Sequence, residues 1–242
     1  SDITFDTDGE IKNFDFYGAK IESKYRLTYA EVEEAILRKK KIGSTSVNES
    51  INALKDLTIT LLGKRAKRNA LEIESSEPIL KINNIGAVEA INLSTRMFAH
   101  QMIEEAMIAA NICAIMFIKN SMEISINRFH DKPDADKLLA LFEKFQSFGI
   151  KKSDDPIILL QRCIEIAKRS ENAASLQSLI LQGLPRAIYS SKKSGHFGLQ
   201  LEEYSHFTSP IRRYPDLIIH RLIKSILKKE KVNFDEALFE EE

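Results

Sequence analysis

One short stretch near the end of the chain, residues 206–221 (HFTSPIRRYPDLIIHR), combines residue types that can handle a phosphate group. Arg212 and Arg213 stand side by side in it, and a guanidinium is suited to gripping a phosphate with two parallel hydrogen bonds. A helix that starts beside them would add free N–H groups and the positive end of its dipole, which together form an anion site. The stretch is therefore either a phosphate-binding site or only a capped helix with a polar surface, and spacing alone does not decide between them.

The place where this helix begins is open. Thr208 or Ser209 can cap a helix, and Pro210 then fits its first position. Pro215 complicates this pattern, because it either kinks that helix or starts a second one, and it pushes Tyr214 away from the helical region.

Asp216, in the same stretch, has two interpretations. Arg212, Asp216 and His220 are spaced by four, so they can form an Arg–Asp–His line on one face of a helix. Alternatively, Asp216 pairs with an arginine on the surface of a helix, where an ion pair contributes little to stability. Spacing alone does not separate the two.

The most apolar segment, residues 97–120, carries a second group of polar side chains. Its apolar residues surround the helix axis, which predicts a central, buried helix. His100 or Gln101, Glu104 and Asn111 recur at helical spacings and share one face. Burying a carboxylate and an amide is costly unless both have partners. Either these residues form a satisfied network in the core, or Glu104 faces a ligand cleft and accepts a hydrogen bond from the ligand.

The elements that must position these residues predict a helix-rich α+β fold, with antiparallel strands packed on long helices. Alternating residues around Asp8–Gly9 predict a hairpin. Thr28 and Glu31 form a capping-box pattern at the start of a helix over residues 27–40, and Ser94 or Thr95 can cap the buried helix. Further helices are predicted over residues 46–68, 97–120, 131–149, 154–169 and 173–184. Strands are predicted over residues 70–74, 78–83, 86–94 and 123–129.

The composition fits a globular protein with a core. The chain has 242 residues, of which 43% are hydrophobic and 29% charged, enough for one large domain or two small ones. Lys+Arg and Asp+Glu both total 35, so the charge balance gives no support for non-specific binding to a polyanion, although a basic channel can still form locally. Two basic stretches, residues 63–69 and 224–231, are interpreted as solvated helix ends.

Several protein classes are disfavoured by missing sequence features. The chain has no apolar run of about eighteen residues and opens with no signal peptide, so no membrane partner is expected. It has no CxxC pair, HExxH, Walker loop, GxSxG or GxGxxG. Cys113 and Cys163 lie in apolar, helix-like stretches and are predicted to be buried free thiols in a cytoplasmic protein.

Five motifs, in this order, resemble the RNB catalytic domain of the ribonuclease II and ribonuclease R exoribonucleases. The forms of the last two look closer to ribonuclease R. The motifs are SKYRLTYAEV (23–32), MIEEAMIAANICAIMFI (102–118), RFHDKPD (128–134), GHFGL (195–199) and HFTSPIRRYPDL (206–217).

The resemblance implies processive 3′ to 5′ hydrolysis of single-stranded RNA to nucleoside 5′-monophosphates in RNA degradation. It implies two Mg²⁺ ions held by a cluster of aspartates. It makes Arg212 the catalytic arginine, and it implies that Tyr29 and Glu104 recognise the ribose, whose 2′-hydroxyl distinguishes RNA from DNA. The other residues expected to bind RNA are Thr208, Ser209, Arg213 and Tyr214.

The chain also departs from the family pattern. The aspartate cluster of the family, a DxxxxxDxDD-like pattern, lies upstream of the LTY segment, and Asp2, Asp6, Asp8 and Asp15 do not form it. Ile73 stands where the family often has an aromatic residue that stacks on a base.

These departures lead to three expectations. The metal ligands lie outside this chain, so the chain alone is expected to be inactive. Residues 1–232 are expected to form a partial, monomeric RNB domain, and residues 233–242 the start of a truncated segment. The alternative function is a non-catalytic RNA-binding module with the same fold.

Overall fold

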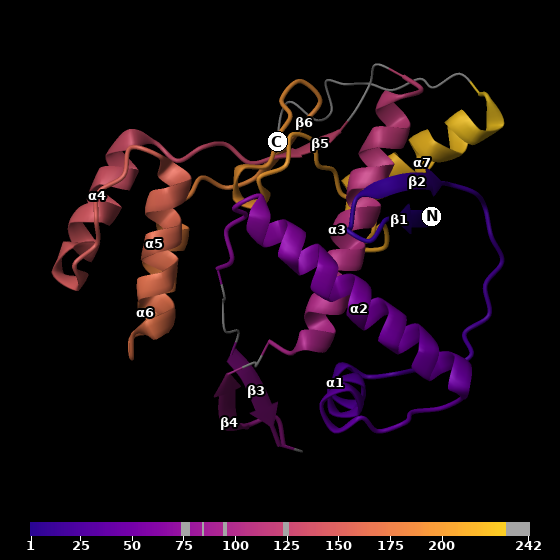
Figure 1. Ribbon diagram of the computed structural model, residues 1–242, viewed down its shortest axis with the longest axis horizontal. Coiled ribbons are helices and arrows are strands. Elements are labelled where there is room, and N and C mark those ends of the chain that lie inside the picture. Colours follow the sequence, from indigo (N-terminus) through magenta and orange to yellow (C-terminus); the bar gives the residue numbers. More distant parts are fainter. Residues whose placement is uncertain (74–77, 84, 94–95, 123–125, 231–242) are drawn as a thin grey trace. The chain divides into compact units, whose positions relative to one another are not determined.

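The computed structural model describes residues 1–73, 78–83, 85–93, 96–122 and 126–230 (Figure 1). The chain divides into two compact units. Unit 1 comprises Ser1–Ala70, Phe98–Asp131 and the residues from Arg186 onward, and unit 2 comprises Leu71–Met97 and Lys132–Pro185.

Unit 1 begins with the predicted hairpin and capped helix. Strands β1 (Asp2–Phe5) and β2 (Ile11–Asp15) pair antiparallel, and Gly9 between them has a φ of +79°, a conformation that glycine adopts without strain. Helix α1 (Tyr29–Arg38) follows. Thr28 Oγ1 accepts a hydrogen bond from the Glu31 N–H (3.3 Å), and the Glu31 carboxylate accepts one from the Thr28 N–H (2.7 Å). The predictions of the hairpin and of the capping box are confirmed.

Three long helices form the framework of unit 1: α2 (Thr45–Lys67), α3 (Phe98–Lys119) and α7 (Tyr214–Lys228). Helix α3 contacts α1, α2 and α7, and Figure 1 shows α2 and α3 crossing. The core beside α3 and α7 contains Phe16, Cys113, Ala114, Ile118, Ile126, Ile218, Ile219, Leu222 and Ile223. Helix α3 is therefore the central, buried helix that its apolar sequence predicts.

Helix α3 is also long and apolar enough, by length and composition, to cross a membrane, and half of its most apolar window is buried inside the protein. Burial among α1, α2 and α7 is typical of a core helix. No other helix in the described ranges meets the same criterion.

A short sheet and an extended segment complete unit 1. Strands β5 (Asn127–Phe129) and β6 (Ile188–Ser190) pair antiparallel. The chain from Gly195 to Ser205 then runs back against β5: the Arg128 N–H donates to the Tyr204 carbonyl (2.7 Å) and the His130 N–H donates to the Gly195 carbonyl (3.1 Å). This segment leads directly into the loop before α7.

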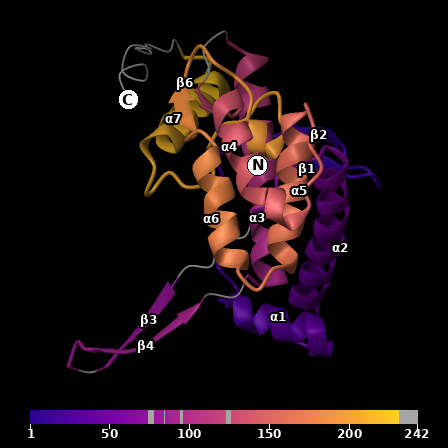
Figure 2. The same cartoon turned by 90° about the vertical axis from the view of Figure 1, so that its left-hand side faces the viewer.

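Unit 2 contains a hairpin and a group of helices, all visible in Figure 2. Strands β3 (Pro78–Ile82) and β4 (Val88–Leu93) pair antiparallel. Helices α4 (Ala135–Phe145), α5 (Pro156–Arg169) and α6 (Ala173–Gly183) contact one another, with Phe145, Leu160 and Ile180 fully buried. The Asp155 carboxylate caps α5 by accepting from the Ile157 N–H (2.8 Å).

The helix-rich α+β prediction, with antiparallel strand pairs, is confirmed. The strand predicted over residues 70–74 is wrong for residues 70–73, which have no regular structure. In the segment 123–129 the described strand is Asn127–Phe129. Residues 123–125, the caps Ser94 and Thr95, and the terminal segment 231–242 lie outside the described residues.

Candidate functional site

The loop from Phe207 to Arg213 is fixed through its backbone by a buried amide on α3. Asn111 is 2% exposed, and its Oδ1 accepts hydrogen bonds from the N–H groups of Phe207 (2.8 Å) and Thr208 (3.3 Å). Its Nδ2 donates to the Tyr204 hydroxyl (2.9 Å). The amide is therefore satisfied inside the core, as the network interpretation of the α3 stripe expects.

A buried carboxylate fixes the other half of the loop. Asp216 is 0% exposed, and its Oδ1 accepts from the Ser209 N–H (2.7 Å) and from Arg213 Nη2 (2.7 Å). The Ser209 carbonyl in turn accepts from the N–H groups of Arg212 (3.3 Å) and Arg213 (3.1 Å). The segment is thus a tight turn whose backbone is held by a buried side chain.

Helix α7 starts after this turn, at Tyr214, with Pro215 in its first turn. The prediction that Thr208 or Ser209 caps a helix with Pro210 in its first position is wrong. The physical reason is that the turn begun at Ser209, whose carbonyl accepts from the N–H groups of Arg212 and Arg213, ends at Arg213, whose backbone is extended (φ −128°, ψ 118°). The alternative in which Pro215 marks the helix start is confirmed.

The proposed Arg–Asp–His line does not form. Asp216 pairs with Arg213, and His220 Nε2 donates to the carbonyl of Phe207 (2.9 Å), on whose ring the imidazole also stacks. The alternative, an ion pair between Asp216 and an arginine, is confirmed, but the pair is buried rather than on the surface. Arg212 is exposed, and no carboxylate of the described residues lies within ion-pairing distance of it.

A row of aromatic rings lies behind the loop. The Tyr189 hydroxyl is hydrogen-bonded to His206 Nδ1 (2.8 Å), and Tyr204 contacts both His206 and His196 edge-on. Burial, with the nearby Arg213 charge, lowers the pKa of His206 to about 4. Burial, with His130 alongside, lowers the pKa of His196 to about 3. Both imidazoles are therefore neutral at pH 7.

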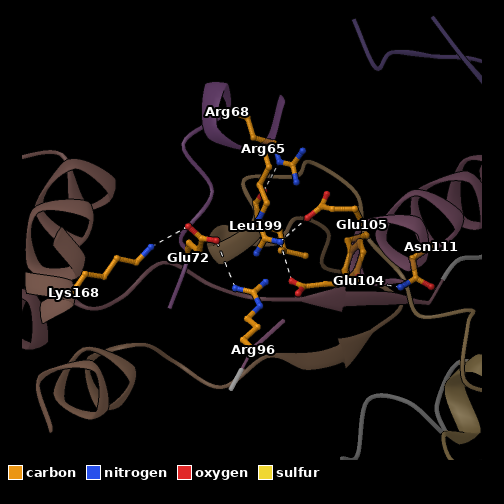
Figure 3. A network of polar contacts seen from close by, with 10 residues as sticks. Arg65, Arg68, Glu72, Arg96, Glu104, Glu105, Asn111, Lys168 and Leu199 are labelled. Carbon is orange, nitrogen blue, oxygen red and sulfur yellow. Dashed lines mark hydrogen bonds and ion pairs between the residues drawn. The ribbon is translucent and has the colours of Figure 1, made fainter. Parts of the chain in front are cut away.

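A second polar group joins α2 to α3 (Figure 3). Arg65 Nη1 donates to Glu104 Oε1 (2.9 Å) and to Glu105 Oε1 (2.8 Å). The exposed fractions of these side chains are 11% for Arg65, 3% for Glu105 and 37% for Glu104. Burial alone would lower the pKa of Arg65, but the two carboxylates outweigh it and raise that pKa. Two of the three charges are thus enclosed, and Glu104 is the one that reaches solvent.

Arg68, at the end of α2, is held differently. Its Nε donates to the carbonyl of Leu199 (2.9 Å), and burial lowers its pKa. The interpretation of residues 63–69 as a solvated helix end is therefore wrong for Arg65 and Arg68. Its error is visible in the spacing, because residues 54, 58, 61, 65 and 68 follow one another by three or four along the buried face of α2.

Tyr29, the first residue of α1, stacks on His100 of α3, with ring centroids 4.1 Å apart and planes inclined by 28°. Of the alternatives His100 and Gln101, the structure thus brings His100 to a residue predicted to bind the ribose. Tyr29 is 46% exposed and borders an apolar cavity of about 460 Å³ that Val32, Ile51 and Met102 help to line.

Unit 2 carries its own ion group, also drawn in Figure 3. The Glu72 carboxylate pairs with Arg96 (3.5 Å) and with Lys168 (3.0 Å). Ile73, next to Glu72, is half-buried.

No group of three or more His, Cys, Asp or Glu side chains that could hold a metal ion occurs in the part of the chain that the structure describes. The described residues therefore do not fit a metal centre of the kind that the resemblance implies. Asp6, one of the early aspartates, accepts instead from the N–H groups of Asp8 and Glu10 in its own turn.

The structure gathers the predicted residues into two groups. Thr208, Ser209, Arg212 and Arg213 lie in one loop that is tied to Asn111 of α3 and to Asp216, and Tyr214 follows the loop as the first residue of α7. Glu104 lies seven residues earlier on the same helix, which is roughly 10 Å along its axis, and Tyr29 contacts α3 one turn before that. Helix α3 thus connects both groups.

This α+β fold, built around a buried central helix with an exposed arginine in the loop before α7, matches a known family. The chain belongs to the RNB domain family, whose match covers residues 1–229. It is 33% identical over 236 residues to ribonuclease R of Escherichia coli, covering 95% of this chain and 29% of that protein. It is also 33% identical over 242 residues to ribonuclease R of Aquifex aeolicus, covering 98% of this chain and 34% of that protein.

A solved structure agrees with this assignment. Ribonuclease R of Mycoplasma genitalium, in complex with ribose-methylated single-stranded RNA, matches with a TM-score of 0.87 at 27% identity, covering 99% of this chain and 38% of that chain. The chain thus spans about a third of the length of the curated relatives described above.

Proposed function

We propose that the protein is a cytoplasmic 3′ to 5′ exoribonuclease that degrades single-stranded RNA processively to nucleoside 5′-monophosphates. The observation that carries this proposal is the exposed guanidinium of Arg212 on a turn whose backbone is held by buried acceptors. The likeness to ribonuclease R at 33% identity supports it.

Arg212 is the group assigned to the scissile phosphate. A cation that is fixed before the reaction stabilises the charge that develops in the transition state without having to reorganise. Arg213 pairs with Asp216, which offsets much of its charge, so its part is a weaker contact with the RNA backbone than that of Arg212. Thr208, Ser209 and Tyr214 complete the RNA-facing surface of the loop.

Tyr29 and Glu104 are assigned to the ribose. Tyr29 offers a half-exposed ring supported by His100, and Glu104 offers a partly exposed carboxylate. A carboxylate accepts a hydrogen bond from a 2′-hydroxyl, which DNA lacks. This pair therefore gives the site its preference for RNA.

RNB-domain ribonucleases generally use a divalent metal, and we propose Mg²⁺ as that ion, which would supply Lewis-acid chemistry when bound by ligands elsewhere. Because the described residues do not form a metal cluster, we place the ligands outside the described residues. What these residues supply is binding, orientation and the charge of Arg212.

The test compares the complete gene product with residues 1–242 alone, in nuclease-free preparations with Mg²⁺. Single-stranded RNA labelled at the 5′ end should pass to a short end product with few intermediates, and RNA labelled at the 3′ end should release labelled mononucleotide at once. Only the complete gene product should do this. Mononucleotide release by residues 1–242 alone contradicts the placement of the metal ligands, and release from the 5′ end contradicts the direction.

A non-catalytic RNA-binding module is the other outcome of this experiment. It would bind single-stranded RNA with an affinity that falls as salt rises, yet leave labelled RNA intact under every metal condition.

A further inference from the structure

We infer that Arg65 is a positioning residue that sets the preference for RNA over DNA by holding the carboxylate of Glu104. The inference rests on the proposed function, in which Glu104 accepts a hydrogen bond from the ribose. Arg65 itself belongs to α2 and is 9% exposed, so it acts through Glu104 and not by touching RNA.

The geometry makes Arg65 the fixed point of the group. One nitrogen, Nη1, donates to an oxygen of Glu104 and to an oxygen of Glu105, at 2.9 and 2.8 Å. Glu104 and Glu105 are consecutive residues on α3, whose side chains point in different directions around a helix. A single nitrogen between the two therefore restricts where the Glu104 carboxylate can lie.

The charges of the group explain why Glu104 can still bind a ligand. Glu105 is 3% exposed, and with the enclosed Arg65 it forms a neutral pair. Glu104 adds one further negative charge at the exposed end, with 37% of its side chain accessible. A carboxylate has about four acceptor positions, so the bond from Arg65 does not by itself prevent Glu104 from accepting a hydrogen bond from a hydroxyl.

Without Arg65 the two carboxylates would lose the cation that lies between them. One of them would take up a proton or turn away into solvent, because like charges in a poorly solvated place disfavour ionisation. Either change removes a fixed acceptor from the position of the 2′-hydroxyl. Binding of the phosphates and bases, which DNA also offers, would change less.

The chain supplies a matched control in Arg68. It stands one turn further on, is half-buried, and donates to the Leu199 carbonyl rather than to Glu104. Arg68→Met removes an arginine that is half-buried at the same helix end but leaves the contact between Arg65 and Glu104 in place.

The experiment measures kcat/KM and Kd of the complete gene product for an RNA oligonucleotide and for the DNA of the same sequence. Arg65→Met should lower the RNA-to-DNA ratio about tenfold, the size expected for a hydrogen bond to a charged group. Arg65→Lys, which keeps the charge but not the planar fork, should restore part of the ratio. Arg68→Met should leave the ratio unchanged even if it lowers the melting temperature.

A folded Arg65→Met variant with the wild-type ratio overturns the inference. Equal losses of the ratio in Arg65→Met and Arg68→Met also overturn it, since they indicate a general structural role. If Arg65→Met does not fold, Arg65→Gln, which keeps a donor for one carboxylate, is judged by the same criterion.

Failure of the proposed function looks different. In that case the wild-type protein does not cleave RNA, or Glu104→Gln keeps the wild-type ratio. Loss of the ratio in Glu104→Gln with no loss in Arg65→Met overturns the role of Arg65 alone.

Discussion

The loop from Phe207 to Arg213 and the group formed by Arg65, Glu104 and Glu105 both contact helix α3, but they are held in place in different ways. In the loop, buried side chains hold backbone N–H groups, so the side chain of Arg212 is left for the surroundings. In the α2–α3 group, side chains hold one another, and a single carboxylate is left partly exposed.

The difference teaches how each site obtains rigidity. The loop is rigid because its backbone N–H groups donate to Asn111 and Asp216. The charge of Arg212 is therefore not used to hold the loop in place. The α2–α3 group is rigid because charge pairs with charge, so the acting carboxylate is itself part of the support. Mutations should therefore separate stability from activity in the loop and couple them in the other group.

The largest effect is expected from Asp216→Ala. It leaves the Arg213 guanidinium, which is 19% exposed, without its partner and the Ser209 N–H without its acceptor, and removing one partner of an enclosed ion pair costs about 3–5 kcal/mol. Urea denaturation should show this loss in the free energy of unfolding. Glu203→Ala, which removes a more exposed ion pair with Lys119, is the matched control and should cost about 1 kcal/mol or less. Equal losses of unfolding free energy in the two variants would contradict the argument that Asp216 contributes more to stability than a more exposed ion pair does.

Arg212→Ala should come next, and its effect should fall on the reaction rather than on stability. Loss of one preorganised charge stabiliser costs on the order of 2.7–4 kcal/mol, so cleavage by the complete gene product should slow roughly a hundred- to a thousandfold. Arg221→Ala, at an exposed position of α7, is the control. If RNA affinity collapses while single-turnover cleavage of bound RNA stays normal, Arg212 is a binding residue and not a catalytic one.

Asn111→Leu should affect stability and cleavage together, to a smaller extent. It removes the acceptor of two loop N–H groups, and a buried donor left unsatisfied costs about 1–3 kcal/mol. Asn111→Asp keeps an acceptor at the same place and should cleave faster than Asn111→Leu. If both variants have lower melting temperatures yet cleave at the wild-type rate, Asn111 does not position the loop for cleavage.

The smallest effect concerns pH and is absent above neutrality. The folded-state pKa of His206 is about 4 and that of His196 about 3, both lowered from 6.5 mainly by burial. The unfolded chain therefore binds more protons below pH 6.5, and the free energy of unfolding should fall as the pH drops from 6.5 towards 4. His206→Gln should make this decline shallower in denaturation curves taken at successive pH values. An unchanged slope would show that His206 is not the group that titrates.

The elements that were predictable from sequence are those whose signals are local. The hairpin around Gly9 and the capping box of Thr28 and Glu31 depend on residues a few positions apart. The burial of α3 follows from apolar residues on all its sides. The start of α7 was not predictable in this way, because the turn begun at Ser209, which ends at Arg213, is held by acceptors that only the folded chain brings near.

The residues of the candidate site also divide into those that the sequence could predict and those that needed the structure. Arg212, Glu104 and Tyr29 come from motif resemblance, and their roles remain predictions. The role of Arg65 needed the structure, because its two partners lie 39 and 40 residues away on another helix. The helical spacing that continues from Leu61 to Arg65 was the one local signal of its burial.

Each unit contains one buried cysteine, whose rate of chemical modification can report on the opening of that unit. Cys113 lies in unit 1 and Cys163 in unit 2, and both are free and fully buried. Burial raises the pKa of Cys113 to about 11 and that of Cys163 to about 12, so neither carries the reactive thiolate while its unit is closed. The rate at which a thiol reagent modifies each cysteine therefore records how often that unit opens, and the two rates need not agree.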